Sequence, residues 1–152
     1  MSGARVAAPG PDSAFYRGRP NYKGISRLTG RLEAVGRSVL GFRPFDLDRE
    51  LADGDWIDLW GGLQVVHLPG HTAGHSGFYS PSRELLFCGD LFASFGKFSH
   101  LPPTFLNRDS GEVRRSVQKA LELRLEGVLP NHGDRSTPQT HLERLKRFVD
   151  RP

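Results

Sequence analysis

The sequence predicts a mixed α/β (α+β) fold in which helices cover one side of a sheet. Two pairs of apolar segments, each pair joined by a short turn, indicate strands. Three other segments carry apolar residues three and four positions apart, which is typical of amphipathic helices. The 18 glycines and 11 prolines favour short elements joined by turns over a helical bundle. The expected order is helix, four strands in hairpins, helix, strand and helix.

A chain of 152 residues is long enough for one domain, so a single domain is expected over residues 1–152. Residues 1–14 are small and rich in proline and glycine, and we expect them to be poorly ordered. Residues 15–44 are expected to be mainly helical. Their apolar stripe consists of Ile25, Leu28, Leu32, Val35 and Val39.

The strands are expected within residues 53–133. The first hairpin joins residues 56–60 to 63–68, and the second joins residues 77–80 to 85–88. Residues 92–107 are aromatic and aperiodic, so we expect a long loop there. A short buried strand is expected at Val128 and Leu129.

Two helix starts carry capping signals. Asp109 is followed three residues later by Glu112, which is the pattern of a capping box. Thr137 precedes Pro138, which is the pattern of an N-cap with proline at the first helical position. A C-terminal helix is therefore expected over residues 137–150.

Charge and composition exclude several function classes. The 21 basic residues exceed the 17 acidic residues by a net charge of only +4, and they form no dense block, so nucleic acid is not an expected partner. No apolar run is long enough to span a membrane, and the first residues lack the apolar region of a signal peptide. The single cysteine, Cys88, allows no internal disulfide, and a cytoplasmic protein is expected.

Three strand ends are each followed by a possible metal ligand. His71 follows Leu68-Pro69-Gly70, Asp90 follows an apolar strand and Gly89, and His132 follows Pro130-Asn131. Taken singly, each has an ordinary interpretation as a turn, cap or surface residue. Ends of neighbouring strands converge, however, and imidazole and carboxylate groups bind zinc-like ions. We therefore expect the three side chains to share one cleft.

The three motifs are Pro-Gly-His-Thr-Ala-Gly-His, Leu-Phe-Cys-Gly-Asp and Leu-Pro-Asn-His-Gly. Their order and spacing resemble the second half of the metallo-β-lactamase superfamily, in particular its glyoxalase II-like metallo-hydrolases. The resemblance implies an αββα sandwich that is incomplete here and mainly its second half. It also implies that His71 binds a first metal, that Asp90 bridges two metals and that His132 binds the second. His75 matches a histidine that orients its neighbours without binding metal.

The family's His-x-His-x-Asp-His motif has no counterpart in this sequence. Because that motif supplies four of the seven expected ligands, we expect a truncated chain that holds metal weakly. The strands also lack an opposing layer, so a homo-oligomer or a separate N-terminal half is an expected partner. The residues that need such a layer are Val65, Leu68, Phe78, Leu86 and Val128. Cys88 is expected to be a buried apolar residue rather than a ligand.

The resemblance implies a metal-dependent hydrolase with two zinc ions, or iron or manganese in their place. A metal-bound hydroxide would attack an ester, thioester, lactone or phosphodiester bond of a small-molecule substrate, with His71, Asp90 and His132 as the catalytic set. The chain alone is expected to be weak or inactive. Two alternatives remain open: a non-catalytic module that pairs with another chain, and a binder of one metal through the same three residues.

Overall fold

The computed structural model describes residues 5–18, 41 and 43–149. The strands are β1 (Ala7–Pro9), β2 (Arg49–Leu51), β3 (Trp56–Ile57), β4 (Leu63–His67), β5 (Ser76–Ser80), β6 (Leu85–Ser94) and β7 (Gly127–Gly133). The α-helices are α1 (Ser13–Tyr16), α3 (Ser110–Leu121) and α4 (Pro138–Lys146), and the 3-10 turns are η1 (Gly10–Asp12), η2 (Gly96–Phe98) and η3 (Thr104–Leu106). None of these helices is long and apolar enough to cross a membrane.

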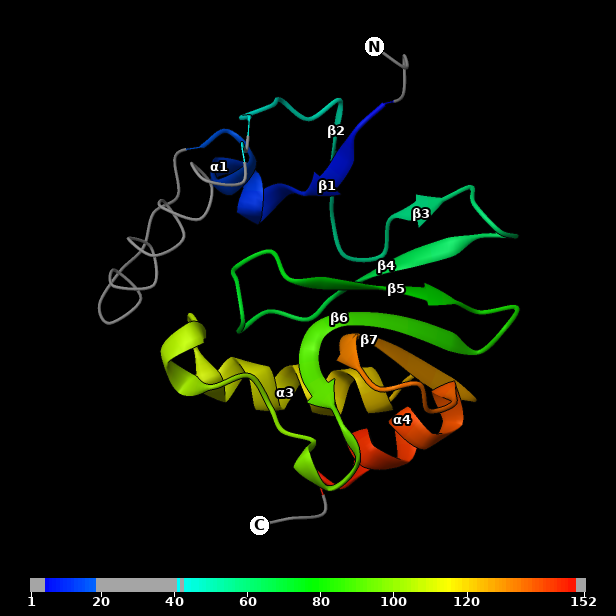
Figure 1. Ribbon diagram of the computed structural model, residues 1–152. Helices are drawn as coiled ribbons and strands as arrows, with labels where there is room; N and C mark the ends of the chain where they lie inside the picture. The colour runs from blue at the N-terminus through cyan, green and yellow to red at the C-terminus, as the bar shows by residue number, and fades with distance from the viewer. Residues whose placement is uncertain (1–4, 19–40, 42, 150–152) are drawn as a thin grey trace.

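Five strands form one sheet in the order β3-β4-β5-β6-β7, and β1 pairs with β2 in a separate parallel pair. The hairpins β3–β4 and β5–β6 are antiparallel, as the sequence predicts. β6 and β7 are parallel, and α3 lies on the connection between them, because parallel strands need a long crossover. Figure 1 shows α3 and α4 beside β6 and β7, away from the β1–β2 pair. The mixed α/β prediction is confirmed.

Both predicted helix starts are confirmed. Asp109 Oδ1 accepts hydrogen bonds from the backbone N–H groups of Gly111 and Glu112 at 2.8 and 3.0 Å. The reciprocal bond of a capping box does not form, because the N–H of Asp109 donates to the carbonyl of Gly70 at 2.9 Å. This bond ties the start of α3 to the turn that precedes His71. Thr137 Oγ1 accepts from the N–H of Thr140 at 3.3 Å and caps α4.

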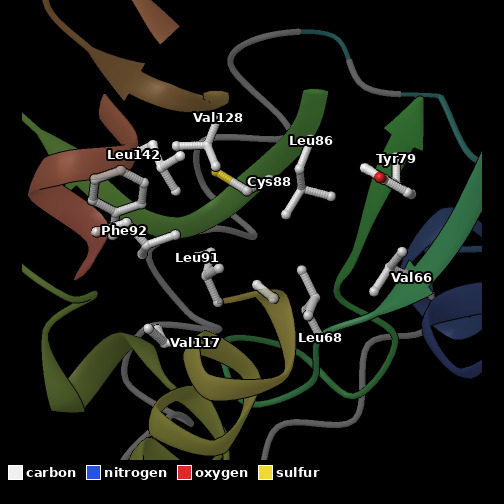
Figure 2. Packing of buried hydrophobic residues seen from close by; sticks show 12 residues of the cluster. Val66, Leu68, Tyr79, Leu86, Cys88, Leu91, Phe92, Val117, Val128 and Leu142 are labelled. Carbon is white, nitrogen blue, oxygen red and sulfur yellow. The ribbon is translucent and has the colours of Figure 1, made fainter. Parts of the chain in front are cut away.

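The main core lies between the sheet and the two long helices (Figure 2). Strand residues on this side meet Val117 of α3 and Leu142 of α4. The strands contribute Val66, Tyr79, Leu86, Cys88, Leu91, Phe92 and Val128 to this cluster, and Leu68 follows directly after β4. Each fully buried aliphatic side chain of this kind contributes about 1.5–3 kcal/mol. Cys88 is buried, as expected, and its burial raises the pKa of the thiol to about 12.

The opposite face of the sheet carries a second apolar row, made of Val65, Phe78, Phe87 and Leu129 across β4 to β7. Val65 is buried, whereas the other three are partly exposed. Trp60 packs on this row with its ring centroid 6.0 Å from that of Phe87, and it remains 64% exposed. The expectation that five strand residues need one opposing layer is therefore wrong in part. Leu68, Leu86 and Val128 face the helices, because their register places them on the covered side.

Several expected boundaries differ from the structure. The strand expected over residues 56–60 ends at Ile57, the strand expected at Val128 and Leu129 extends over Gly127–Gly133, and the helix expected over residues 137–150 ends at Lys146. Residues 7–14, expected to be poorly ordered, form β1, η1 and the start of α1, since β1 pairs with β2. Within the expected helical segment, residues 17–18 form a turn and residues 43–44 contain no helix. The expected stripe at residues 25–39 lies outside the described residues. The expected loop over residues 92–107 begins later, because β6 continues to Ser94 and Phe92 is buried in the core.

The isolated 152-residue chain is expected to self-associate, because the exposed Trp60 ring and the row containing Phe87 on which it packs leave apolar area open to solvent. Light scattering should find a dimer or larger species. Trp60→Ser should shift the population toward monomer, whereas Phe98→Ser, at an exposed aromatic outside the row, should not. A monodisperse wild-type monomer with a sharp thermal transition would show that the face needs no cover.

Candidate metal centre

The structure brings the three predicted ligands together from separate elements. His71 lies in the turn between β4 and β5, Asp90 lies in β6, and His132 lies near the end of β7. The distance from His71 Nε2 to Asp90 Oδ2 is 3.9 Å, and that from His132 Nε2 to Asp90 Oδ1 is 3.3 Å. Each carboxylate oxygen therefore faces a different imidazole.

This donor set fits two zinc-like ions. Zinc lies about 2.0–2.2 Å from nitrogen and oxygen ligands, so two donors to one ion lie no more than about 4.2 Å apart. Both histidine–carboxylate distances meet that limit. Within the described residues no three His, Cys, Asp or Glu side chains gather into one ligand cluster. Each oxygen of Asp90 therefore lies close enough to one imidazole nitrogen to share an ion with it, which gives two donors on each side of the carboxylate.

A break in the β6–β7 ladder frees Asp90 for this role. Gly89 pairs with Pro130 and Ala93 pairs with His132, so β6 advances by four residues where β7 advances by two. An irregularity of this kind re-aims a side chain at the cost of local pairing. Gly89 has φ +56, and a Cβ there would lie 2.9 Å from His75 Nε2, so glycine is required at the break.

His75 links the turn after β4 to the backbone at Asp90. Its Nδ1 lies 2.7 Å from the carbonyl oxygen of Leu68, and its Nε2 accepts from the N–H of Asp90 at 3.0 Å. The hydrogen therefore lies on Nδ1. Burial lowers the pKa of His75, which favours the neutral ring that this pattern needs. Both ring nitrogens are engaged by backbone groups.

Asn107 orients His71, a contact that the sequence does not reveal. Its Nδ2 donates to the carbonyl of Pro102 at 2.9 Å and to Ser110 Oγ at 3.0 Å. Its Oδ1 is therefore the atom that faces His71 Nδ1, at 3.3 Å. A hydrogen on Nδ1 leaves the lone pair of Nε2 directed toward Asp90, as in the outer partners of metal-binding histidines. The one sequence signal is the position of Asn107, two residues before the α3 cap.

Asn131 and Asp12 also support the site. Asn131 Nδ2 donates to Asp90 Oδ1 at 3.2 Å, the same oxygen that faces His132. Asp12 is buried, and its Oδ1 accepts from the N–H of Gly74 at 2.8 Å while its other oxygen accepts from the Thr72 hydroxyl. Asp12 thereby holds the turn between His71 and His75 from a distant part of the chain.

The family model described as the metallo-beta-lactamase superfamily matches residues 4–132. The chain belongs to this superfamily. A hydroxyacylglutathione hydrolase from Hyphomonas neptunium is 39% identical over 117 residues, which is 62% of this chain and 45% of that protein. An acyl-coenzyme A thioesterase from Bos taurus is 32% identical over 83 residues, which is 54% of this chain and 30% of that protein.

Solved structures of other proteins share the fold of this chain. A metallo-beta-lactamase family protein from Thermus thermophilus has a TM-score of 0.67 at 19% identity, over 97% of this chain and 52% of that one. A protein solved in a di-iron-bound form has a TM-score of 0.58 at 25% identity, over 91% of this chain and 62% of that one. All four similarities span less than two-thirds of the relative's own length.

Asp12→Ala is expected to lower the free energy of unfolding by about 1–3 kcal/mol, because a buried N–H and a hydroxyl lose their acceptor. Urea denaturation measures the change. The matched control is Asp46→Ala, whose side chain is 88% exposed beside Arg17, and its effect should stay within about 0.5 kcal/mol. Equal effects for the two variants would argue against a role for Asp12 in holding the turn.

Proposed function

We propose that this chain provides part of the metal site of a hydrolase that cleaves thioesters. The observation that carries the proposal is the Asp90 carboxylate, which faces His71 with one oxygen and His132 with the other. A single carboxylate between two imidazoles is suited to bridging two cations, since each oxygen serves one of them.

In this proposal His71 and Asp90 hold one ion, and Asp90 and His132 hold the other. Two such ions lower the pKa of a bound water and polarise a carbonyl oxygen. Asn107 keeps the Nε2 lone pair of His71 available, and Asn131 fixes one oxygen of Asp90. His75 holds the backbone of Asp90 in place. Asn107, Asn131 and His75 thus orient the donor atoms of His71 and Asp90 before a metal ion binds.

The proposed substrate class is an acyl group carried by a thiol. The two relatives named above act on hydroxyacylglutathione and on acyl-coenzyme A, according to their names. The segment of residues 95–106 begins just after Ala93, which pairs with His132, and ends at Asn107, which contacts His71. It presents Phe95, Phe98 and Phe105 to solvent, 44, 71 and 58% exposed. We infer that these rings form a wall for the acyl chain.

The second candidate is a non-catalytic module that pairs with another chain. The apolar row of Val65, Phe78, Phe87 and Leu129 supports it, because a partly exposed row of this kind is typical of an interface. This candidate does not require the histidines, so it predicts that His71→Ala and His132→Ala leave the function intact. The hydrolase requires both.

Metal binding by the chain alone is expected to be weak, since each position has two protein donors and zinc sites commonly use three or four. After mild dialysis the purified chain should hold well under one zinc, iron or manganese ion in total. Elemental analysis of wild type beside His71→Ala decides this. Two tightly held ions per wild-type chain would show that the ligand assignment is incomplete.

Hydrolysis by the chain alone is expected to be no faster than hydrolysis by the His71→Ala variant. The test substrate is an acylated glutathione, with a lactone and a phosphodiester as comparisons. Adding a separate polypeptide that carries a His-x-His-x-Asp-His segment should raise the rate for wild type and make it sensitive to chelator. Robust activity of the 152 residues alone would mean that other residues complete the site.

A further inference from the structure

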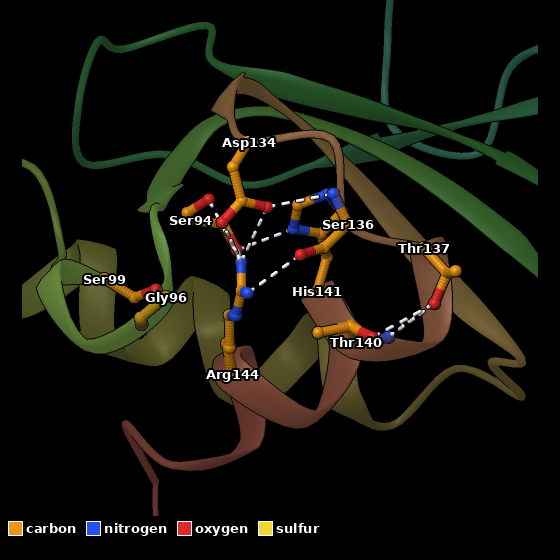
Figure 3. Close-up of polar contacts among 9 residues, drawn as sticks. All are labelled: Ser94, Gly96, Ser99, Asp134, Ser136, Thr137, Thr140, His141 and Arg144. Carbon is orange, nitrogen blue, oxygen red and sulfur yellow. Dashed lines mark hydrogen bonds and ion pairs between the residues drawn. The ribbon is translucent and has the colours of Figure 1, made fainter.

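Arg144 of α4 hydrogen-bonds to residues at the ends of β6 and β7, the two strands that carry Asp90 and His132 (Figure 3). Its Nη1 donates to the carbonyl oxygen of Ser94, the last residue of β6, at 3.2 Å. The same nitrogen lies 3.0 Å from both carboxylate oxygens of Asp134, the residue that follows β7. Its Nη2 donates to Ser136 Oγ at 2.8 Å. One guanidinium therefore joins a helix to the ends of two neighbouring strands.

Ser94 and His141 of this cluster are buried and Arg144 is mostly buried, whereas Asp134 lies at its exposed edge. Ser94 is 0% exposed, His141 is 2% exposed, and the side chain of Arg144 is 11% exposed. Ser94 Oγ accepts from Arg144 at 3.2 Å, so its own hydrogen can be donated to His141 Nδ1 at 2.6 Å. The hydrogen bonds from Arg144 hold the pKa of Asp134 well below its usual range. Hydrogen bonds among partly buried groups are stronger than those in water, so the network helps to hold Arg144 in place.

The position of the cluster relates to the break in the ladder at Asp90. Pairing between β6 and β7 stops after Gly89 and resumes only at Ala93–His132 and Ser94–Gly133. One further backbone bond follows, from the N–H of Asp134 to the carbonyl oxygen of Ser94 at 2.9 Å. This resumed stretch of pairing is short, so few backbone hydrogen bonds hold the ends of β6 and β7 together there.

His132 depends on this stretch, because its side chain is 68% exposed and gains little from packing. The placement of its ring opposite Asp90 is therefore set by the backbone that carries it. Ser94 anchors the β6 side of the resumed stretch and Asp134 anchors the β7 side, and Arg144 contacts both.

We propose that Arg144, with Asp134, is a positioning residue that closes the β6–β7 ladder beyond the break and so sets the distance between His132 and Asp90. The importance of Arg144 for catalysis rests on the function proposed above. The closure of the strand ends by Arg144 is independent of that function and can be tested without metal.

Amide hydrogen exchange followed by NMR on the full chain tests the closure. In Arg144→Met the N–H of Asp134 should exchange at least tenfold faster, while amides of the β4–β5 hairpin keep their wild-type rates. Lys146→Met is the matched control, because Lys146 lies on the same helix and pairs with the exposed Glu143. Asp134→Asn keeps the shape of the side chain and should give a smaller, selective increase in the exchange rate of the same N–H. This variant replaces Arg144→Met as the test if Arg144→Met unfolds. A uniform increase over all amides, or equal rates in the two helix variants, would overturn the proposal.

Zinc affinity tests the link to His132. Competition with a chromophoric chelator should show about tenfold weaker zinc binding in Arg144→Met, the usual effect of losing an outer partner. The loss should vanish on a His132→Ala background and persist on a His71→Ala background. Selective exchange at Asp134 with unchanged zinc affinity would refute the link. A wild-type chain without any zinc response would count against the proposed function, whereas the exchange rates would still decide whether Arg144 closes the strand ends.

Discussion

The carboxylate of Asp90 meets both imidazoles because β6 leaves its pairing with β7 between Gly89 and Ala93. In a regular ladder, successive side chains point to opposite faces of the sheet, and the backbone N–H and C=O groups bond to the neighbouring strands. The break releases the N–H of Asp90, which needs another partner. His75 Nε2 is that partner. The same irregularity thus aims the carboxylate and fixes the second histidine of the turn.

The arrangement is held by hydrogen bonds that come from distant parts of the chain. Asp12, ahead of α1, holds the turn between His71 and His75. Asn107, ahead of α3, orients the His71 ring, and Arg144 of α4 ties the strand ends beyond Asp90. Precision in such a site depends on supports of this kind, because an exposed side chain such as that of His132 gains little from packing and relies on the backbone that carries it.

The sequence predicts those features that depend on neighbouring residues. The two hairpins, the caps at Asp109 and Thr137, and the choice of His71, Asp90 and His132 as candidate ligands all follow from local patterns, although Asp90 lies within β6 and not at its end. The supports from Asp12, Asn107 and Arg144 do not, since each contact joins segments remote in sequence and each residue type is common on surfaces. The true length of β6 is also hidden, because the break at Asp90 disrupts the alternation that identifies a strand.

The two tryptophans lie at the same edge of the sheet, Trp56 in β3 and Trp60 in the turn that follows. Both are more than half exposed, and neither belongs to the core between the sheet and the helices. Intrinsic tryptophan fluorescence of this chain therefore reports this hairpin and the face of the sheet on which Trp60 packs against Phe87. A fluorescence change that precedes the loss of circular dichroism would reflect opening of that edge or its contact with another molecule, with the helix-side core still intact.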